Sequence, residues 1–197
     1  MPYLYIIGGP NGAGKTTAAF SLLPDTFETI EFVNADEIAR GISPLNPEAV
    51  SFHAGRIMLG RIRELLSNNS SLAFETTLSG LSYQKLIGQA KRSGYKIVLF
   101  FVYLNNYKLA KERVNFRVSK GGHNIPSDVI ERRYKKGLLN FNSYAAMADN
   151  WYIYDNSGAG YLLVAKSIGN KREIYNFDVY NKITANSEKK ENRRSKR

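Results

Sequence analysis

One ten-residue stretch near the start of the printed chain constrains the fold more than any other feature. Residues 8–17 read GGPNGAGKTT and contain the spacing G-x-x-x-x-G-K-[ST], which begins at Gly9 and ends with Gly14, Lys15 and Thr16. Backbone N–H groups that converge on phosphate oxygens require glycines that adopt positive φ and leave room for the ligand. The stretch is therefore predicted to be a phosphate-binding loop (P-loop), which occurs between a β-strand and the helix that follows it.

The residues on both sides of this loop have the expected pattern. YLYIIG (3–8) is a short apolar run of strand-forming residues, and KTTAAFSLL (15–23) predicts a helix that ends at Pro24. We expect Lys15 to reach the β- and γ-phosphates of ATP or GTP, and the Thr16 hydroxyl to bind Mg²⁺. The predicted nucleotide-binding residues are Gly9, Pro10, Asn11, Gly12, Ala13, Gly14, Lys15, Thr16 and Thr17.

Apolar runs and helical patterns alternate along the rest of the chain. Further strands are expected near residues 29–33, 71–77, 96–104 and 151–158, with helices between them. The run KIVLFFVYL (96–104) is apolar throughout, which is typical of a strand covered on both faces of a parallel sheet. The pattern predicts an α/β, P-loop kinase-like fold: a parallel sheet of about five strands, helices on both faces, and a C-terminal β-hairpin over residues 161–176.

Length and charge distribution indicate one domain with a basic tail. A chain of 197 residues suffices for a single domain, which we expect to span residues 1–185. The net charge of +11 is concentrated in two segments: residues 108–136 hold nine Lys or Arg and three acidic residues, and residues 186–197 hold six Lys or Arg and two Glu. The second segment has few apolar residues and is predicted to be disordered.

The same composition argues against a membrane protein. No apolar run approaches the roughly 20 residues of a transmembrane helix. The first ten residues carry neither the basic segment nor the cleavage-site pattern of a signal peptide, and the sequence has no cysteine. We expect a cytoplasmic protein without a membrane partner.

Polar residues follow the second and third predicted strands, where parallel sheets bind ligands. Asp36 follows the second strand, and Glu75 and Thr77 end the third. Phosphoryl transfer needs a group that accepts the proton of the attacking hydroxyl, and Asp36 is predicted to be that base. The alternative is a structural role for Asp36, as an Asx turn or the N-cap of a helix at residues 37–40. Glu75 is expected to bind Mg²⁺ through water or to bind an acceptor hydroxyl.

The basic segment is predicted to form a mobile lid over residues 113–133. Arg113 and Arg117 are four residues apart and share one helix face, and a Gly-Gly pair at 121–122 follows as a hinge. Arginines brought over the phosphates stabilise the charge of the transition state. Arg117 is the first candidate and Arg113 the second, with Arg132 or Arg133 third. For His123, a lid contact and an ordinary surface position both remain open.

One resemblance is misleading. The sequence GPNGAGKTT also occurs in ABC transporter ATPases, and LSGLSYQ (78–84) is similar to their signature motif. In that family the signature precedes a strand that ends in Asp-Glu, whereas the strand predicted at 96–104 is followed by Asn105 and Asn106. A mechanical ATPase is therefore not expected.

A set of five motifs resembles the zeta toxin family of P-loop small-molecule kinases, in particular the branch often labelled predicted ABC-type ATPases. The motifs are GPNGAGKTT, NADEIARGISPLNPE, FETTLSG, RVNFRVSKGGHNIP and WYIYDNS, which lie within residues 3–158. The resemblance implies transfer of phosphate from ATP, with Mg²⁺, to a hydroxyl of UDP-N-acetylglucosamine, and an inhibitory antitoxin partner. By position it implies a phosphate lysine at Lys15, a base at Asp36, acceptor contacts at Glu75 and Thr77, and lid arginines at Arg113 and Arg117.

Two other functions stay open at this point. A polynucleotide kinase would use the basic lid and tail to hold a nucleic-acid end, and its binding would weaken steeply with salt. Nucleic acid is the less expected partner, because the sequence shows no aromatic stacking platform among the basic residues. A nucleotide-dependent binding protein would signal occupancy to a partner without transferring phosphate. A small-molecule acceptor, such as a nucleotide sugar, is the expected substrate.

Overall fold

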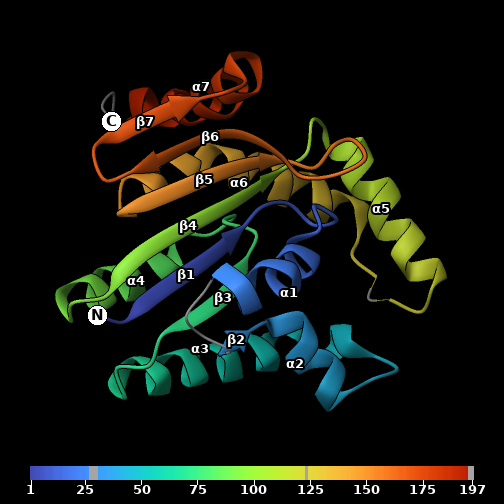
Figure 1. Ribbon diagram of the computed structural model, residues 1–197. Helices are drawn as coiled ribbons and strands as arrows, with labels where there is room; N and C mark the ends of the chain where they lie inside the picture. Colours follow the sequence, from blue (N-terminus) through green and yellow to red (C-terminus); the bar gives the residue numbers. More distant parts are fainter. Residues whose placement is uncertain (27–30, 123, 195–197) are drawn as a thin grey trace.

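A single β-sheet forms the centre of the computed structural model, which describes residues 1–26, 31–122 and 124–194. Within these residues the sheet has seven strands in the order β2-β3-β1-β4-β5-β6-β7 (Figure 1). Strands β2, β3, β1, β4 and β5 are parallel, and β6 and β7 extend the sheet as an antiparallel hairpin. The strands are β1 Tyr3–Gly8, β2 Phe32–Val33, β3 Leu72–Thr76, β4 Lys96–Tyr103, β5 Asn150–Asp155, β6 Leu162–Ile168 and β7 Lys171–Ile174.

Helices connect the parallel strands and follow the hairpin. They are α1 Lys15–Thr26, α2 Ala35–Ile42, α3 Ser51–Ser67, α4 Ser82–Arg92, α5 Tyr107–Ser119, α6 Ser127–Ala145 and α7 Phe177–Arg194, with a short 3₁₀ helix η1 Pro47–Val50 before α3. The predicted fold class is confirmed, including the five parallel strands and the C-terminal hairpin. None of the described helices has the length and apolar character that a membrane span requires.

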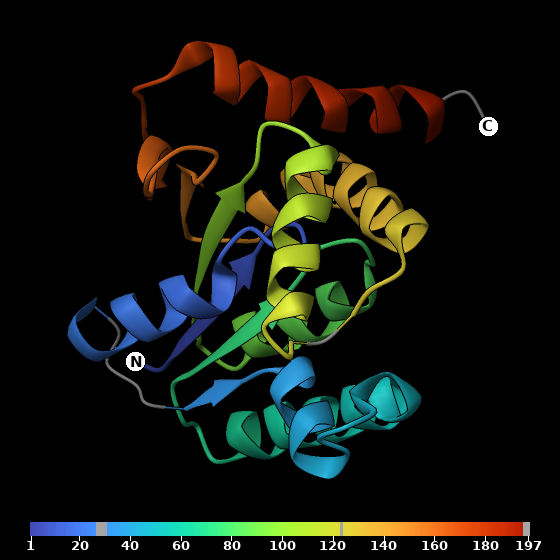
Figure 2. The same ribbon diagram turned by 90° about the vertical axis from the view of Figure 1, so that its right-hand side faces the viewer.

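The two faces of the sheet have different cores because successive side chains of a strand point to opposite faces. Leu4 and Ile6 of β1 belong to the larger core, which also contains buried side chains of α3, α4 and α6. Tyr5 and Ile7 belong to a smaller core that includes Ala19 of α1. Figure 2 shows α1 on one side of the strands and α6 on the other. Helices therefore cover both faces, as expected, and the buried core on one face is larger than the core on the other.

The register brings the carboxyl ends of the central strands to one edge. Gly8, the last residue of β1, lies opposite Thr76 of β3 and Phe101 of β4. Val33 at the end of β2 lies opposite Phe74 of β3. The loops that begin after β1, β2 and β3 therefore start side by side, as the sequence predicted for Lys15, Asp36 and Glu75.

The structure differs from the sequence predictions at two helix ends. Helix α1 continues to Thr26, two residues beyond the end predicted at Pro24. The tail predicted to be disordered from residue 186 is helical as far as Arg194, because α7 begins at Phe177 and runs through it. Lysine, glutamate and arginine are good helix formers, so a low apolar content does not prevent them from extending a helix that has already begun. The boundary of the domain at residue 185 stays a prediction.

Two glycine-to-alanine substitutions within helices test the packing of α6 against the sheet. In Gly137→Ala the new Cβ would lie 2.6 Å from the backbone oxygen of Thr77, so we expect unfolding to become easier by about 1–3 kcal/mol. Gly60 of α3 has nothing within 4 Å of its Cβ position, so Gly60→Ala is expected to add up to about 1 kcal/mol of stability. Urea denaturation measures both, and equal effects would contradict the packing described.

Candidate active site

The loop between β1 and α1 has the backbone shape that its glycines allow. Gly9, Gly12 and Gly14 have φ values of 144°, 74° and 86°, in the region that favours glycine. A Cβ on Gly9 would lie 2.2 Å from the backbone oxygen of Val102, so no other residue fits there. The strand, glycine loop and helix are thus in the arrangement that a phosphate-binding loop requires.

Glu75, at the end of β3, holds the key side chains of this loop together. Its Oε1 lies 3.3 Å from Nζ of Lys15, and its Oε2 accepts a 2.6 Å hydrogen bond from the Thr16 hydroxyl. The same Oε2 accepts a 2.9 Å hydrogen bond from Nδ2 of Asn34. Lys15 is buried, and its Nζ also donates to the carbonyl oxygen of Pro10 at 2.9 Å. Glu75 therefore connects the P-loop to the loop after β2.

Thr16 and Glu75 form an oxygen pair that fits a magnesium ion. Mg²⁺ in phosphate-binding sites takes one or two protein oxygens and completes its shell with water and substrate phosphates. In the part of the chain that the structure describes, no group of three or more His, Cys, Asp or Glu could hold a metal ion on its own. The pair therefore fits a metal that completes its shell with water and nucleotide phosphates.

Helix α2 is capped by Asn34. The alternative in which Asp36 caps this helix is therefore wrong. The side chain of Asn34 accepts a 2.8 Å hydrogen bond from the backbone N–H of Asp36, the interaction of an N-cap. Asp36 lies in the first turn of the helix, half-buried, and its carboxylate makes no hydrogen bond or ion pair with any described residue. The cap function thus falls to Asn34, and the Asp36 carboxylate is left available.

A cavity of about 300 Å³ brings five of the predicted site residues together. Its lining includes Asn11 and Lys15 from the P-loop, and Asp36, Glu75 and Thr77 from the two neighbouring loops. The Oδ1 atom of Asn11 is buried and has no hydrogen-bond partner among the described residues, so it can accept a bond from a ligand. The cavity is therefore lined by groups that can contact both a phosphate and a hydroxyl.

Helix α6 fixes the loop that forms one wall of this cavity. Leu78 is fully buried and has φ of 54°, which is unusual for a leucine. Asn140 donates a 2.7 Å hydrogen bond to the backbone oxygen of Leu78, and the Tyr144 hydroxyl donates to that of Gly80 at 2.5 Å. Burial raises the pKa of Tyr144, so its hydroxyl stays a donor at neutral pH. These contacts hold the strained backbone around Leu78 in place at this wall of the cavity.

The arginines of the basic segment occupy three different environments. Arg113 lies beside the P-loop, where a Cβ on Gly12 would come within 3.2 Å of its Cβ. Arg117 packs under Gly122 and does not line the cavity. Arg133 does line it, and makes no ion pair with a described residue, whereas Arg132 lies 3.9 Å from Asp128.

Arg133, the third candidate from the sequence together with Arg132, is therefore the one of these four arginines that lines the cavity. The catalytic roles of Arg113 and Arg117, and the motion of the lid, stay predictions. His123 lies outside the described residues.

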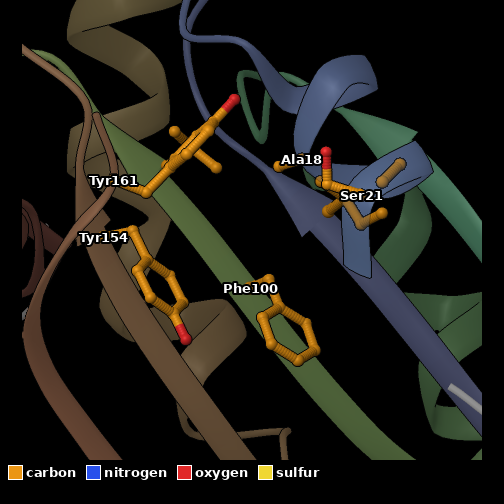
Figure 3. Close-up of a pocket in the computed structure, with 8 residues that line it drawn as sticks. Ala18, Ser21, Phe100, Tyr154 and Tyr161 are labelled. Carbon is orange, nitrogen blue, oxygen red and sulfur yellow. The ribbon is translucent and has the colours of Figure 1, made fainter. Parts of the chain in front are cut away.

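Two residues after β5 also contact the P-loop and were missed from the sequence. Asn156 donates to the backbone oxygen of Ala13 at 2.8 Å, and the Tyr161 hydroxyl donates to that of Gly14 at 2.7 Å. Figure 3 shows the Tyr161 hydroxyl pointing away from the apolar pocket of about 130 Å³ that its ring helps to line. Burial raises the pKa of Tyr161, although nearby Arg113 opposes the shift. No local motif predicts contacts between residues so distant in the sequence.

A glycine loop that leads into a helix at the carboxyl edge of a parallel sheet, with its lysine beside a carboxylate, defines a P-loop kinase-like protein. The chain belongs to the zeta toxin family, whose sequence model matches residues 1–165. A Haemophilus influenzae protein, named only as uncharacterized, is 32% identical over 126 residues, which cover 64% of this chain and 88% of that protein.

Solved structures show the same fold. The crystal structure of AvrRxo1-ORF1:-ORF2 with ATP is similar with a TM-score of 0.74 and 19% identity, over 93% of this chain and 64% of that chain. A structure of the PezAT chromosomal toxin-antitoxin system of Streptococcus pneumoniae has a TM-score of 0.66 and 18% identity, over 93% of this chain and 78% of that chain. At these identities the likeness concerns the fold, and this chain spans less than two thirds of the AvrRxo1 chain it matches.

The two roles of Asn34 are tested by comparison with a second asparagine before a helix. Asn34→Ala removes the cap of α2 and a bond to Glu75, so we expect a loss of about 1–2 kcal/mol in the free energy of unfolding. Asn46 precedes η1 but makes no side-chain cap bond, so Asn46→Ala is expected to change stability by less than about 0.5 kcal/mol. Chemical denaturation compares the two; a neutral Asn34→Ala would contradict the cap.

Proposed function

We propose that this protein is a kinase that transfers the γ-phosphate of ATP, or of GTP, to a hydroxyl of a small molecule bound in the 300 Å³ cavity. The observation that carries the proposal is the carboxylate of Asp36, which has no partner among the described residues and lines the same cavity as Lys15 and Glu75. A half-buried carboxylate in a cavity that it shares with the P-loop lysine supports a role as general base. A protein that only sensed nucleotide would have no use for it.

In this mechanism the residues around the cavity accept a proton, stabilise charge and hold the metal. The Asp36 carboxylate accepts the proton of the acceptor hydroxyl while that oxygen forms a bond to the γ-phosphorus. The bond between the γ-phosphorus and the bridging oxygen breaks, and ADP leaves with that oxygen. Lys15 stabilises negative charge on the phosphates, and Thr16 and Glu75 would hold Mg²⁺. Mg²⁺, when bound, supplies positive charge at the phosphate oxygens.

The acceptor is proposed to carry a negatively charged group. Arg133 is a cation that lines the cavity without an ion-pair partner among the described residues, and a phosphate group on the acceptor would provide one. A nucleotide sugar, and in particular a UDP-amino sugar as implied by the family resemblance, has this property. Glu75 and Thr77 are proposed to contact its hydroxyls, and Arg113 and Arg117 to approach the phosphates of the donor.

An antitoxin is proposed as a protein partner. The family takes its name from a toxin, and a similar structure comes from a toxin-antitoxin system. Co-purification of this chain with the product of a neighbouring reading frame would test the partnership.

The role of Asp36 is tested with its neighbour as the control. Asp36→Asn keeps the size of the side chain and removes the base, so we expect phosphate transfer to fall by about 10²- to 10⁴-fold while ATP binding is retained. Glu37 is exposed and pairs with Arg40, so Glu37→Gln is expected to leave transfer unchanged. The assay supplies labelled ATP and a metabolite extract and identifies the labelled product by mass. Normal transfer by Asp36→Asn would exclude the assigned base.

Two adjacent arginines test the charge of the acceptor. Arg133→Gln removes the cation that α6 contributes to the cavity, and we expect the KM of the identified acceptor to rise about tenfold with little change in kcat. Arg132→Gln removes an exposed cation outside the cavity and is expected to leave both constants unchanged. A loss of kcat in Arg133→Gln with unchanged KM would instead assign Arg133 to the transition state.

A further inference from the structure

A second cavity lies at the edge of the sheet opposite the P-loop. It has a volume of about 450 Å³ and lies between α6, the start of β5, β7 and α7. Trp151 is the second residue of β5, so this cavity is at the amino ends of the parallel strands, whereas the kinase site is at their carboxyl ends. Figure 2 shows α7 crossing one end of the molecule beside α6. The cavity is therefore separate from the site described above.

Aromatic rings form its inner wall. The ring of Phe141 meets Trp151 edge to face, with centroids 6.1 Å apart, and the ring of Tyr180 stacks on Trp151 at 6.3 Å with an angle of 15°. Trp151 and Phe141 are buried, and they belong to the main core. Their positions are therefore set by the fold, whereas Tyr180 is half-buried.

Arg172 of β7 extends over this wall. Ser167 of β6 lies opposite both Trp151 and Arg172 in the sheet, and its small side chain leaves room between them. The guanidinium carbon of Arg172 lies 5.5 Å from the centre of the Trp151 ring, and its NH1 donates a 3.0 Å hydrogen bond to the Tyr180 hydroxyl. These two contacts fix the guanidinium at the cavity.

The charge of the cavity is positive. Arg172 is the single charged side chain among the described residues that line it, and it makes no ion pair with any described residue. A guanidinium has five N–H donors, and the contact with Tyr180 uses one of them. Asn142, Asn181 and Thr184 add amide and hydroxyl groups to the lining. An arginine held in place without a carboxylate partner is preorganised to bind a phosphate or carboxylate.

We infer that this cavity is a binding site for a planar aromatic anion of the size of a nucleoside monophosphate. Trp151 is covered by Tyr180 and Arg172, so the half-buried Tyr180 ring and the exposed guanidinium of Arg172 would contact the ligand ring, and the free donors of Arg172 would bind the phosphate. The volume is within the range of small-molecule sites, roughly 300–1,000 Å³. The inference is independent of the proposed kinase reaction, because the two sites share no lining residue.

The sequence provides a direct reporter for this site, because Trp151 is the single tryptophan of the chain. The protein is titrated with AMP while tryptophan fluorescence is excited at its red edge and corrected for absorption by adenine. We expect AMP to change the fluorescence in a saturable way. Adenosine and inorganic phosphate, which each supply one half of the interaction, are expected to bind at least about tenfold more weakly.

Variants assign the response to the cavity. Arg172→Gln is expected to raise the apparent Kd for AMP at least about tenfold, whereas Lys171→Gln, an exposed cation one residue away, is expected to leave it unchanged. Asn181→Leu places an apolar side chain in the cavity from α7 and is expected to abolish the response without removing Arg172. Lys15→Ala, which impairs the P-loop, is expected to keep it.

Three results would overturn the inference. One is a Trp151 fluorescence that AMP does not change. Another is an apparent Kd for AMP that is the same in Arg172→Gln and in Lys171→Gln. Loss of the response in Lys15→Ala would also contradict it, since the signal would then come from the P-loop.

Discussion

The rest of the candidate active site depends on the ion pair and the hydrogen bonds of the Glu75 carboxylate. It lies at the end of β3, next to β1 in the sheet, and binds Lys15, Thr16 and Asn34 at once. Because Asn34 also caps α2, the same network determines where Asp36 stands relative to the P-loop. A mostly buried carboxylate with three polar partners keeps its charge compensated and its geometry fixed. The phosphate site and the candidate base are thus positioned by one residue.

Helix α6 connects this site to the rest of the molecule. Its first half contributes Arg133 to the cavity beside the P-loop, and Asn140 and Tyr144 hold the strained wall around Leu78. Its second half contributes Phe141 to the inner wall of the cavity at the opposite edge of the sheet. A ligand in the second cavity would therefore contact the helix that shapes the first.

Local patterns in the sequence predicted the parts of the structure that depend on neighbouring residues. The P-loop was predictable because its glycines must adopt positive φ, and the common edge of Lys15, Asp36 and Glu75 follows from a parallel sheet. Asn34 carries an N-cap signature, an asparagine before an acidic first turn, whereas sequence reasoning had considered the cap only for Asp36, as the alternative to its role as the base. Contacts such as that of Tyr161 with Gly14 join segments 147 residues apart, and no local pattern contains them. The position of Arg133 likewise depends on how α6 packs.

The central claim is that Glu75 prepares Lys15 and Thr16 for a nucleotide whose terminal phosphate faces Asp36. A crystal structure of this protein with Mg²⁺ and a non-hydrolysable ATP analogue tests it most directly. Nζ of Lys15 is expected to leave the Pro10 oxygen for the phosphates, and a carboxylate oxygen of Asp36 to face the γ-phosphorus across the acceptor cavity. A triphosphate bound away from Lys15, or an Asp36 side chain directed out of the cavity, would contradict the claim.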